Sequence, residues 1–140
     1  MKCSDEKGFS LLELLIVVVT ILIVAALAVP SLQKAARSAE NGNAFSTMRT
    51  IATTQVGFYS QNSRFGRFSE MNSLLPQSVG TITFNQINHG KFVIAMVPAT
   101  PTDAELRSEF EITATRNVSS ESTIYKYRIT QTGVLEQLLP

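Results

Sequence analysis

A single carboxylate inside an apolar stretch is the residue of this chain with the most distinctive chemistry. Glu13 lies four residues after Phe9 in a stretch, residues 9–29, that is otherwise almost entirely apolar. A carboxylate in hydrocarbon is costly, and it is rarely left without a partner. Glu13 is therefore expected to pair with a cation, and the pair is expected to have a function.

Conventional catalytic sets are missing from the sequence. His89 is the only histidine, it falls in a predicted turn, and we interpret it as a surface residue rather than a metal ligand. Cys3 is the only cysteine, so no intrachain disulfide is possible. No Ser–His–Asp set and no glycine-rich phosphate loop can be assembled. We predict a protein that is not an enzyme and that has no metal and no cofactor.

Two charged clusters have a possible functional interpretation and a simpler one. The acidic segment that follows Pro101 contains oxygen ligands of the kind that Ca²⁺ uses, but its spacing fits no known loop, which favours a solvated surface. Its members are Asp103, Glu105, Glu109 and Glu111.

Arg64 and Arg67 lie beside aromatic residues and suit contact with DNA or with an acidic surface, although subunit packing is favoured. The net charge is +1 without a basic block, so nucleic acid is not expected as an obligate partner.

The element that holds Glu13 is long enough to cross a membrane. The stretch of 21 residues from Phe9 to Val29 would form a helix of about 31 Å, which matches a hydrocarbon core of about 30 Å. A secretory signal peptide with Ala26-Leu27-Ala28 as its cleavage site is one interpretation, but Glu13 and Pro30 argue against it. An uncleaved membrane anchor is a second interpretation, and it explains the length alone.

The residues around Glu13 support a third interpretation. Lys7-Gly8-Phe9 followed by Ser10-Leu11-Leu12-Glu13 and an apolar helix resembles the processing site of type IV pilins and the pseudopilins of type II secretion. The resemblance implies a leader of residues 1–8, cleavage after Gly8 by a prepilin peptidase, and methylation of the new amine of Phe9 by the same enzyme. It further implies that residues 9–30 form a transmembrane and filament-core helix.

The resemblance also assigns a role to Glu13. Cleavage would create a positive charge at Phe9, and the carboxylate of Glu13 would pair with that amine on a neighbouring subunit and set the register of assembly. The alternative is that Glu13 extends to the membrane interface without a specific partner. Pro30 is expected to kink or loosen the helix, because proline cannot donate a backbone hydrogen bond.

The remaining residues, 31–140, are expected to form an α+β head. The spacing of apolar residues predicts an amphipathic helix over residues 31–60. The loop that follows, up to residue 77, is expected to include a short helical turn at 69–75. An antiparallel sheet of about three to five strands is predicted at residues 81–84, 91–97, 110–115 and 125–130, with turns at 88–90, 117–120 and 132–133. In this pilin-like fold the hydrophobic half of the helix protrudes and the amphipathic half packs on the sheet. Residues 91–97 are expected to be a central strand that is apolar on both faces. The other sheet face is expected to carry Thr, Glu, Lys and Arg.

Two sets of side chains are expected to pack between helix and sheet. The apolar face of the helix comprises Leu32, Ala35, Ala36, Ala39, Phe45, Met48, Ile51, Ala52, Val56 and Tyr59. A second cluster is aromatic and is interpreted as a hydrophobic seal rather than as a site for electron hopping or ligand stacking. Its members are Phe58, Tyr59, Phe65 and Phe68.

The function implied by the resemblance is polymerisation rather than catalysis. We expect a structural subunit of a type IV pilus, a self-assembling helical homopolymer. Its partners would be the prepilin peptidase and methyltransferase, an inner-membrane assembly platform with its cytoplasmic ATPase, and membrane lipid before assembly. The subunit would cross the bacterial inner membrane once and then enter an extracellular pilus or a periplasmic pseudopilus. The alternatives are a type II secretion pseudopilin and a membrane-anchored binding module that never polymerises.

Overall fold

The computed structural model describes residues 9–116 and 124–139 and divides the chain into two compact units. The N-terminal unit comprises residues 1–39, and the globular unit comprises residues 40–140. Gly8, the rest of the predicted leader with Cys3, and the turn predicted at 117–120 lie outside the described residues. The boundaries expected at residues 8 and 30 concern processing and assembly, and they stay predictions.

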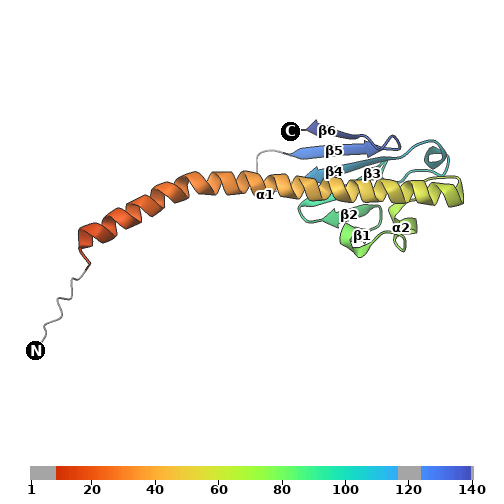
Figure 1. Cartoon of the computed structure of the whole chain (residues 1–140). Helices are drawn as coiled ribbons and strands as arrows, with labels where there is room; N and C mark the ends of the chain where they lie inside the picture. Colours follow the sequence, from red (N-terminus) through yellow and green to blue (C-terminus); the bar gives the residue numbers. More distant parts are fainter. Residues whose placement is uncertain (1–8, 117–123, 140) are drawn as a thin grey trace, which may run out of the picture. The chain divides into compact units, whose positions relative to one another are not determined.

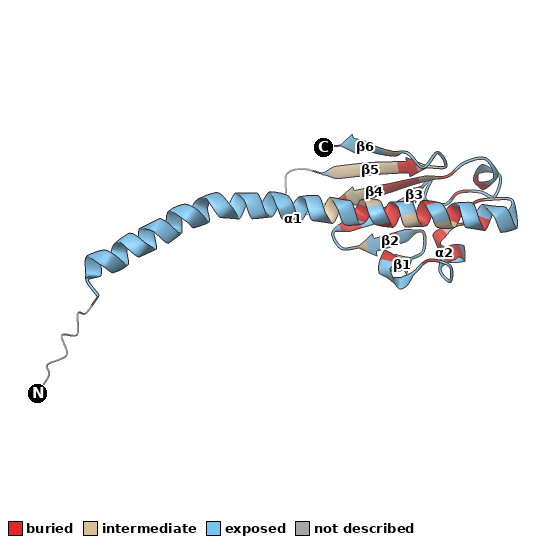
Figure 2. Cartoon of the chain, viewed as in Figure 1, coloured by how far each residue is buried: buried red, intermediate tan, exposed pale blue. Residues whose placement is uncertain are grey.

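One long helix contributes to both units. Helix α1 (Leu11–Asn62) has 52 residues and continues through Pro30 and through the predicted weak point at residues 41–43. Every residue from 9 to 39 is exposed, and burial begins only at residue 40 (Figure 2). The kink expected at Pro30 stays a prediction.

The globular unit is an α+β structure with a six-stranded antiparallel sheet, as Figure 1 shows. The strands are β1 (Thr81–Thr83), β2 (Gln86–His89), β3 (Phe92–Val97), β4 (Glu111–Arg116), β5 (Tyr125–Thr130) and β6 (Leu135–Leu139). Their order in the sheet is their order in the sequence. The short helix α2 (Phe68–Met71) and two 3₁₀ turns, η1 (Gln77–Val79) and η2 (Glu105–Arg107), complete the unit.

The prediction of three to five strands was wrong, because β2 and β6 were not recognised. The sequence of β2 is Gln-Ile-Asn-His, and its polar residues have low strand propensity. The predicted turn at residues 88–90 consequently begins two residues later, at Gly90, whose φ of 59° suits glycine. Strand β6 is a sheet edge in which four of five residues are exposed, so its sequence lacks the alternation of a buried strand.

The core lies between the C-terminal part of α1 and one face of the sheet. Buried residues of α1 recur at steps of three and four, and they are Ala44, Thr47, Met48, Ile51, Ala52, Gln55 and Phe58. The expected apolar face is therefore only partly right. Its first four members, Leu32, Ala35, Ala36 and Ala39, are exposed. Val56 and Tyr59 are also exposed, to 60% and 39%, and Gln55 occupies the buried position instead.

Strand β3 is third in the sheet, but it is not apolar on both faces in the way that was expected. Phe92, Ile94 and Met96 are buried, whereas Val93 and Val97 remain exposed to 39% and 44%. The opposite face carries charged residues, as predicted. On it Arg128 of β5 pairs with Glu136 of β6 at 2.5 Å and lies 3.8 Å from Glu111 of β4.

Candidate functional site

The start of α1 places the carboxylate of Glu13 beside the first backbone groups of the helix. The carbonyl of Ser10 accepts hydrogen bonds from the backbone N–H groups of Glu13, at 3.0 Å, and Leu14, at 3.2 Å. The N–H of Ser10 donates to Oε2 of Glu13 at 3.4 Å. This is one half of a capping box, and it holds the negative charge at the positive end of the helix dipole.

The sequence carried a signal for this arrangement. Ser10-Leu11-Leu12-Glu13 has the Ser-x-x-Glu spacing of a capping box, which the sequence analysis did not recognise. Glu13 was predicted to pair with a cation or to extend to the membrane interface, and neither prediction included a bond to the start of its own helix. The structure adds that the side chain reaches back to a residue adjacent to Phe9, whose own side chain is 81% exposed.

The N-terminal part of α1 is an uncovered apolar surface. The large apolar side chains from Leu11 to Val29 are all between 45% and 82% exposed. Thr20 lies among them, and its hydroxyl donates to the carbonyl of Val17 at 2.8 Å, so it adds little polarity to the surface. By length and composition, α1 is the one helix in the described ranges that is long and apolar enough to cross a membrane.

In the globular unit, an ion cluster ties α1 to the sheet. Glu40 of α1 accepts from Lys91 at 2.8 Å and from Arg116 of β4 at 2.8 Å. Arg116 is 1% exposed, and its guanidinium lies 5.8 Å from the centre of the Tyr125 ring. Because Glu40 and Arg116 are 76 residues apart in the sequence, no local pattern could have revealed this cluster.

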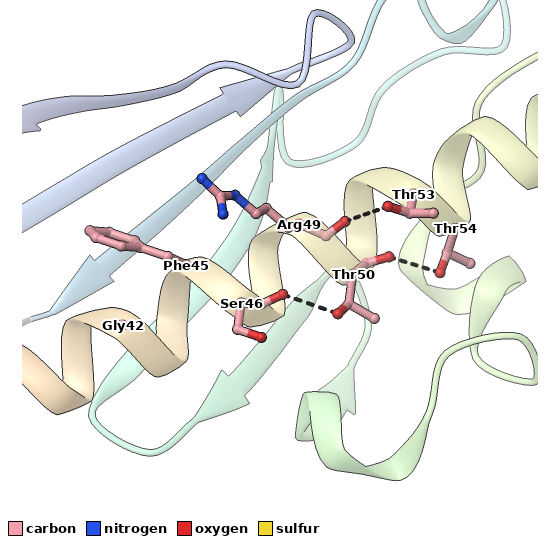
Figure 3. A pocket seen from close by; sticks show the side chains of 7 residues that line it. All are labelled: Gly42, Phe45, Ser46, Arg49, Thr50, Thr53 and Thr54. Atoms are coloured by element: carbon pink, nitrogen blue, oxygen red, sulfur yellow. Dashed lines mark hydrogen bonds between the residues drawn. The ribbon is translucent and has the colours of Figure 1, made fainter.

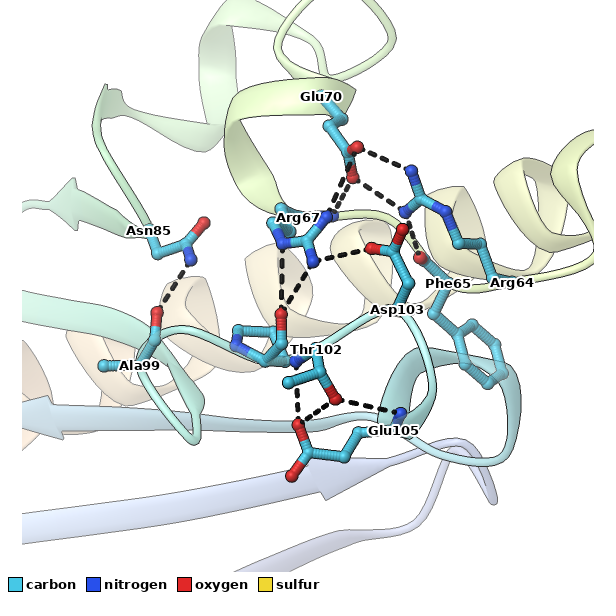
Figure 4. A network of polar contacts seen from close by, with 10 residues as sticks. Arg64, Phe65, Arg67, Glu70, Asn85, Ala99, Thr102, Asp103 and Glu105 are labelled. Carbon is cyan, nitrogen blue, oxygen red and sulfur yellow. Dashed lines mark hydrogen bonds and ion pairs between the residues drawn. The ribbon is translucent and has the colours of Figure 1, made fainter.

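Arg64 and Arg67 are engaged within the globular unit, as Figure 4 shows. Arg64 binds both carboxylate oxygens of Glu70, at 2.6 and 2.9 Å. Arg67 donates to Asp103 at 2.6 Å and to the carbonyl of Pro101 at 2.8 Å. The hydrogen bond from Arg64 is the main cause that lowers the pKa of Glu70 to about 2. These contacts join α2 to the loop after β3. The sequence analysis predicted contacts with DNA, with an acidic surface or with another subunit, and it did not predict this role within the unit.

The acidic segment does not converge on one point. Asp103 pairs with Arg67, whereas Glu105 accepts from the backbone N–H of Thr102 at 2.7 Å, and this bond lowers the pKa of Glu105. Glu111 faces Arg128. In the part of the chain that the structure describes, no group of three or more His, Cys, Asp or Glu side chains is placed to hold a metal ion.

The prediction that His89 is a surface residue in a turn was wrong. His89 ends strand β2 and is half-buried, with Nδ1 3.0 Å from the carbonyl oxygen of Val79 and Nε2 3.4 Å from Oγ1 of Thr47. These partners position the ring between α1 and η1.

The aromatic cluster forms the predicted hydrophobic seal. Phe58, Phe65 and Phe68 are buried, and Tyr59 contributes an exposed edge. The ring of Phe65 lies 4.7 Å from the ring of Tyr59 and 4.7 Å from that of Phe110. The aromatic side chains therefore join the end of α1 to the loop before β4.

Comparison with known proteins identifies the N-terminal segment. Residues 3–29 match the family model of the prokaryotic N-terminal methylation motif. The chain is 32% identical over 72 residues to the type IV major pilin protein PilA of Myxococcus xanthus (strain DK1622). That alignment covers 51% of this chain and 33% of the relative, so the chain spans about a third of the length of the curated relative it matches. No solved structure matches the chain significantly.

Proposed function

We propose that this chain is a structural subunit of a type IV pilus. The premise is that residues 3–29 match the prokaryotic N-terminal methylation motif and that the chain is similar to a type IV major pilin. One combination of features supports the proposal. The motif covers the exposed apolar start of α1, and Glu13, in the first turn, is the only acidic residue from Phe9 to Ala39. Such a surface is stable only in lipid or against similar helices.

Processing would convert the precursor into a subunit that can polymerise. A prepilin peptidase would cleave between Gly8 and Phe9, remove residues 1–8 and allow the amine of Phe9 to be methylated. Ser10 would then be the second residue of the mature chain. Since the N–H of Ser10 already contacts Glu13, the new amine would form within a few ångströms of that carboxylate.

The charge pair would govern register. In a bundle of apolar helices, a carboxylate and an amine each need a partner, because an unpaired charge in such surroundings is strongly unfavourable. Glu13 would therefore pair with the amine of Phe9 on a neighbouring subunit and so select one axial offset between subunits. Its capping bond to Ser10 supports this role by holding the carboxylate at the end of the helix before assembly.

Assembly would transfer the N-terminal helix from lipid to a filament core. Residues 9–30 would span the inner membrane once and then bury their apolar side chains against neighbouring copies, with Pro30 as a place where the helix can bend. An inner-membrane platform and its cytoplasmic ATPase would supply the work of extraction. The destination is the cell surface for a pilus and the periplasm for a pseudopilus.

A type II secretion pseudopilin is the alternative within the same family, and a membrane-anchored module that never polymerises is the alternative outside it. The pseudopilin would share the processing and the core helix. The anchored module would use residues 9–30 only as a span, and it would tolerate the loss of Glu13.

The mature N-terminus and its location test the proposal. Mass spectrometry of the protein from membranes and from sheared cell-surface material would identify the first residue and any methyl group. A chain that begins at methylated Phe9 in sheared filaments supports the pilus subunit. The same start confined to membranes favours the pseudopilin, and a start at Met1 or Val29 contradicts both.

A further inference from the structure

An aromatic side chain stands exposed at the tip of the first hairpin. Phe84 and Asn85 form the two-residue turn between β1 and β2, and the ring of Phe84 is 89% exposed. The φ angle of Phe84 is 53°, a backbone region that a hairpin turn normally fills with glycine, asparagine or aspartate. A bulky residue there is unfavourable both for its backbone and for its exposed ring. The stability of the isolated subunit therefore does not explain Phe84.

The turn that presents Phe84 is anchored from behind. The side-chain N–H of Asn85 donates to the carbonyl of Ala99 at 2.7 Å, which Figure 4 shows beside the arginine network. This bond ties the hairpin tip to the loop that follows β3. The ring is thus held outward on a supported turn.

The exposed face of α1 contains a hollow that suits an aromatic ring. The hollow has a volume of about 630 Å³ and is lined by Gly42, Phe45, Ser46, Arg49, Thr50, Thr53 and Thr54 (Figure 3). The hydroxyls of its three threonines donate to backbone carbonyls of α1 four residues earlier, at 2.9 to 3.0 Å. Because these polar groups are satisfied within the helix, the threonines offer their methyl groups to a partner.

Two further residues that line the hollow are Phe45 and Arg49. Phe45 packs edge-on against Tyr127 with ring centres 4.7 Å apart, and its side chain is only partly buried. Arg49 is exposed, and no carboxylate among the described residues pairs with its guanidinium. An aromatic ring has a negative face that attracts such a cation, and it also packs well against methyl groups and a second ring.

The ring and the hollow are two different surfaces of the globular unit. The hollow runs along α1 from Gly42 to Thr54. Phe84 lies instead at the tip of the β1–β2 hairpin, which is tied to Ala99 after the end of β3. Two different surfaces on one chain are what a head-to-tail contact between identical subunits requires, and such contacts build open helical filaments.

We propose that Phe84 of one subunit docks into the Arg49 hollow of the next copy of this chain. The inference rests on the proposed function, because it supplies a contact between the globular units of a polymer. Phe84 would lie against the guanidinium of Arg49 and the ring of Phe45. This contact explains why an aromatic residue is kept at a turn position that suits glycine.

Disulfide cross-linking of assembled filaments tests the contact. Cleavage after Gly8 would remove Cys3, so the mature chain would hold no competing thiol. The double variant Phe84→Cys with Ser46→Cys should give a ladder of cross-linked multimers under mild oxidation. The control variant, Phe84→Cys with Val56→Cys, places its second thiol on the same helix at a position that is 60% exposed but outside the hollow. It should give no ladder.

Each outcome separates the docking contact from the proposed function. Filaments that begin at Phe9 but form no ladder overturn the contact and assign Phe84 to another partner, such as lipid or a different protein. Absence of wild-type filaments overturns the proposed function and the contact with it. If the double variant does not assemble alone, filaments grown from a mixture with wild-type chains provide the same readout as cross-linked pairs.

A substitution with opposite effects on subunit and filament provides a second test. Phe84→Gly relieves the unfavourable φ, so the melting temperature of the detergent-solubilised full chain should rise or stay constant. The same variant should reduce the yield of sheared filaments and the force that they resist, whereas Phe84→Tyr should preserve both. A filament yield that Phe84→Gly leaves unchanged contradicts the contact.

Discussion

Residues 11–39 and residues 40–62 belong to one helix, yet their side chains find partners in different ways. In the first part every residue is exposed, and the surface is almost wholly apolar as far as Val29, so we expect other molecules to cover it. In the second part apolar residues pack in a core, and Glu40 has partners in the sheet. The comparison teaches that folding of the globular unit and burial of the N-terminal helix are separate problems, the second of which needs other molecules.

The largest effect is expected from a change that affects only the N-terminal part. Glu13→Ala should lower the yield of sheared filaments by about tenfold or more, because an apolar bundle would then hold an amine without its partner. The melting temperature of the globular unit should not change, since Glu13 lies outside that unit, among residues 1–39. Quantitative immunoblotting of sheared and membrane fractions would measure the loss.

Glu13→Gln is the matched control, and it separates the effect of the negative charge from the effect of the size of the side chain. It keeps the size of the side chain and its ability to accept from Ser10, but it removes the negative charge. Assembly at the wild-type level by this variant would contradict charge pairing and leave only the helix cap as the role of Glu13.

The next largest effect is expected in the core of the globular unit. The side chain of Gln55 is completely buried and forms two hydrogen bonds with the backbone of Gly66, at 2.7 and 2.8 Å. Gln55→Leu should reduce the free energy of unfolding by about 2–4 kcal/mol, because it leaves a buried N–H and a buried carbonyl without partners. Urea unfolding of the detergent-solubilised full chain would measure this change.

A control on the same helix defines the baseline for that measurement. Gln61→Ala removes an exposed glutamine and should change the stability by less than about 0.5 kcal/mol. Equal effects of the two substitutions would show that the bond between Gln55 and Gly66 does not stabilise the unit.

The ion cluster at Glu40 lies where the burial of α1 begins. Glu40→Gln should cost about 1–3 kcal/mol, because Arg116 is buried and would lose a charged partner. Lys91→Ala removes a partner that is 49% exposed and should cost less than about 0.5 kcal/mol. If Lys91→Ala lowers the free energy of unfolding as much as Glu40→Gln does, the contribution of the cluster does not come mainly from the pair of Glu40 with the buried Arg116.

The smallest of the four effects is a dependence of stability on pH. The pKa of Glu70 is lowered to about 2 from an ordinary 4.5, chiefly by its hydrogen bond to Arg64. A lowered pKa contributes stability above the ordinary value and loses it as the pH falls from about 4.5 toward 2. The contribution should be about 1 kcal/mol, because Glu70 is near the surface and solvent screens the pair.

Unfolding curves of the wild type and of Glu70→Gln would isolate that contribution. The difference in stability between the two chains should be constant above pH 5 and should shrink in acid. A difference that is independent of pH throughout the acid range would contradict the role of the carboxylate. Glu109→Gln, at an exposed position, serves as the control.

Local pattern predicted the features that depend on neighbouring residues. The apolar run, the short helical turn near residue 70 and strand β5 from Tyr125 to Thr130 were all recognised from composition and alternation. Strand β2 was missed because its stability comes from pairing with β1 and β3 rather than from its own residues. Gln55 was missed because only its distant partner Gly66 makes a polar residue favourable in the core.

The candidate site follows the same division. Glu13 was identified from its unusual place in an apolar stretch, and its neighbours supplied the motif. Its bond to Ser10 was also local, and the Ser-x-x-Glu spacing would have predicted it. By contrast, the hollow around Arg49 could not be predicted from the sequence. The ring of Phe45, which lines it, packs against Tyr127, and that residue is 82 positions away in the sequence.

The strand order of the sheet has a consequence for the speed of folding. Each of the six strands pairs only with its neighbours in sequence, without a crossover, so no pairing joins segments that are distant in the sequence. Sheets built from local pairings form faster than sheets that join distant segments, because less chain entropy is lost before each contact forms. We expect the globular unit to fold faster than a sheet of similar size that pairs segments distant in the sequence.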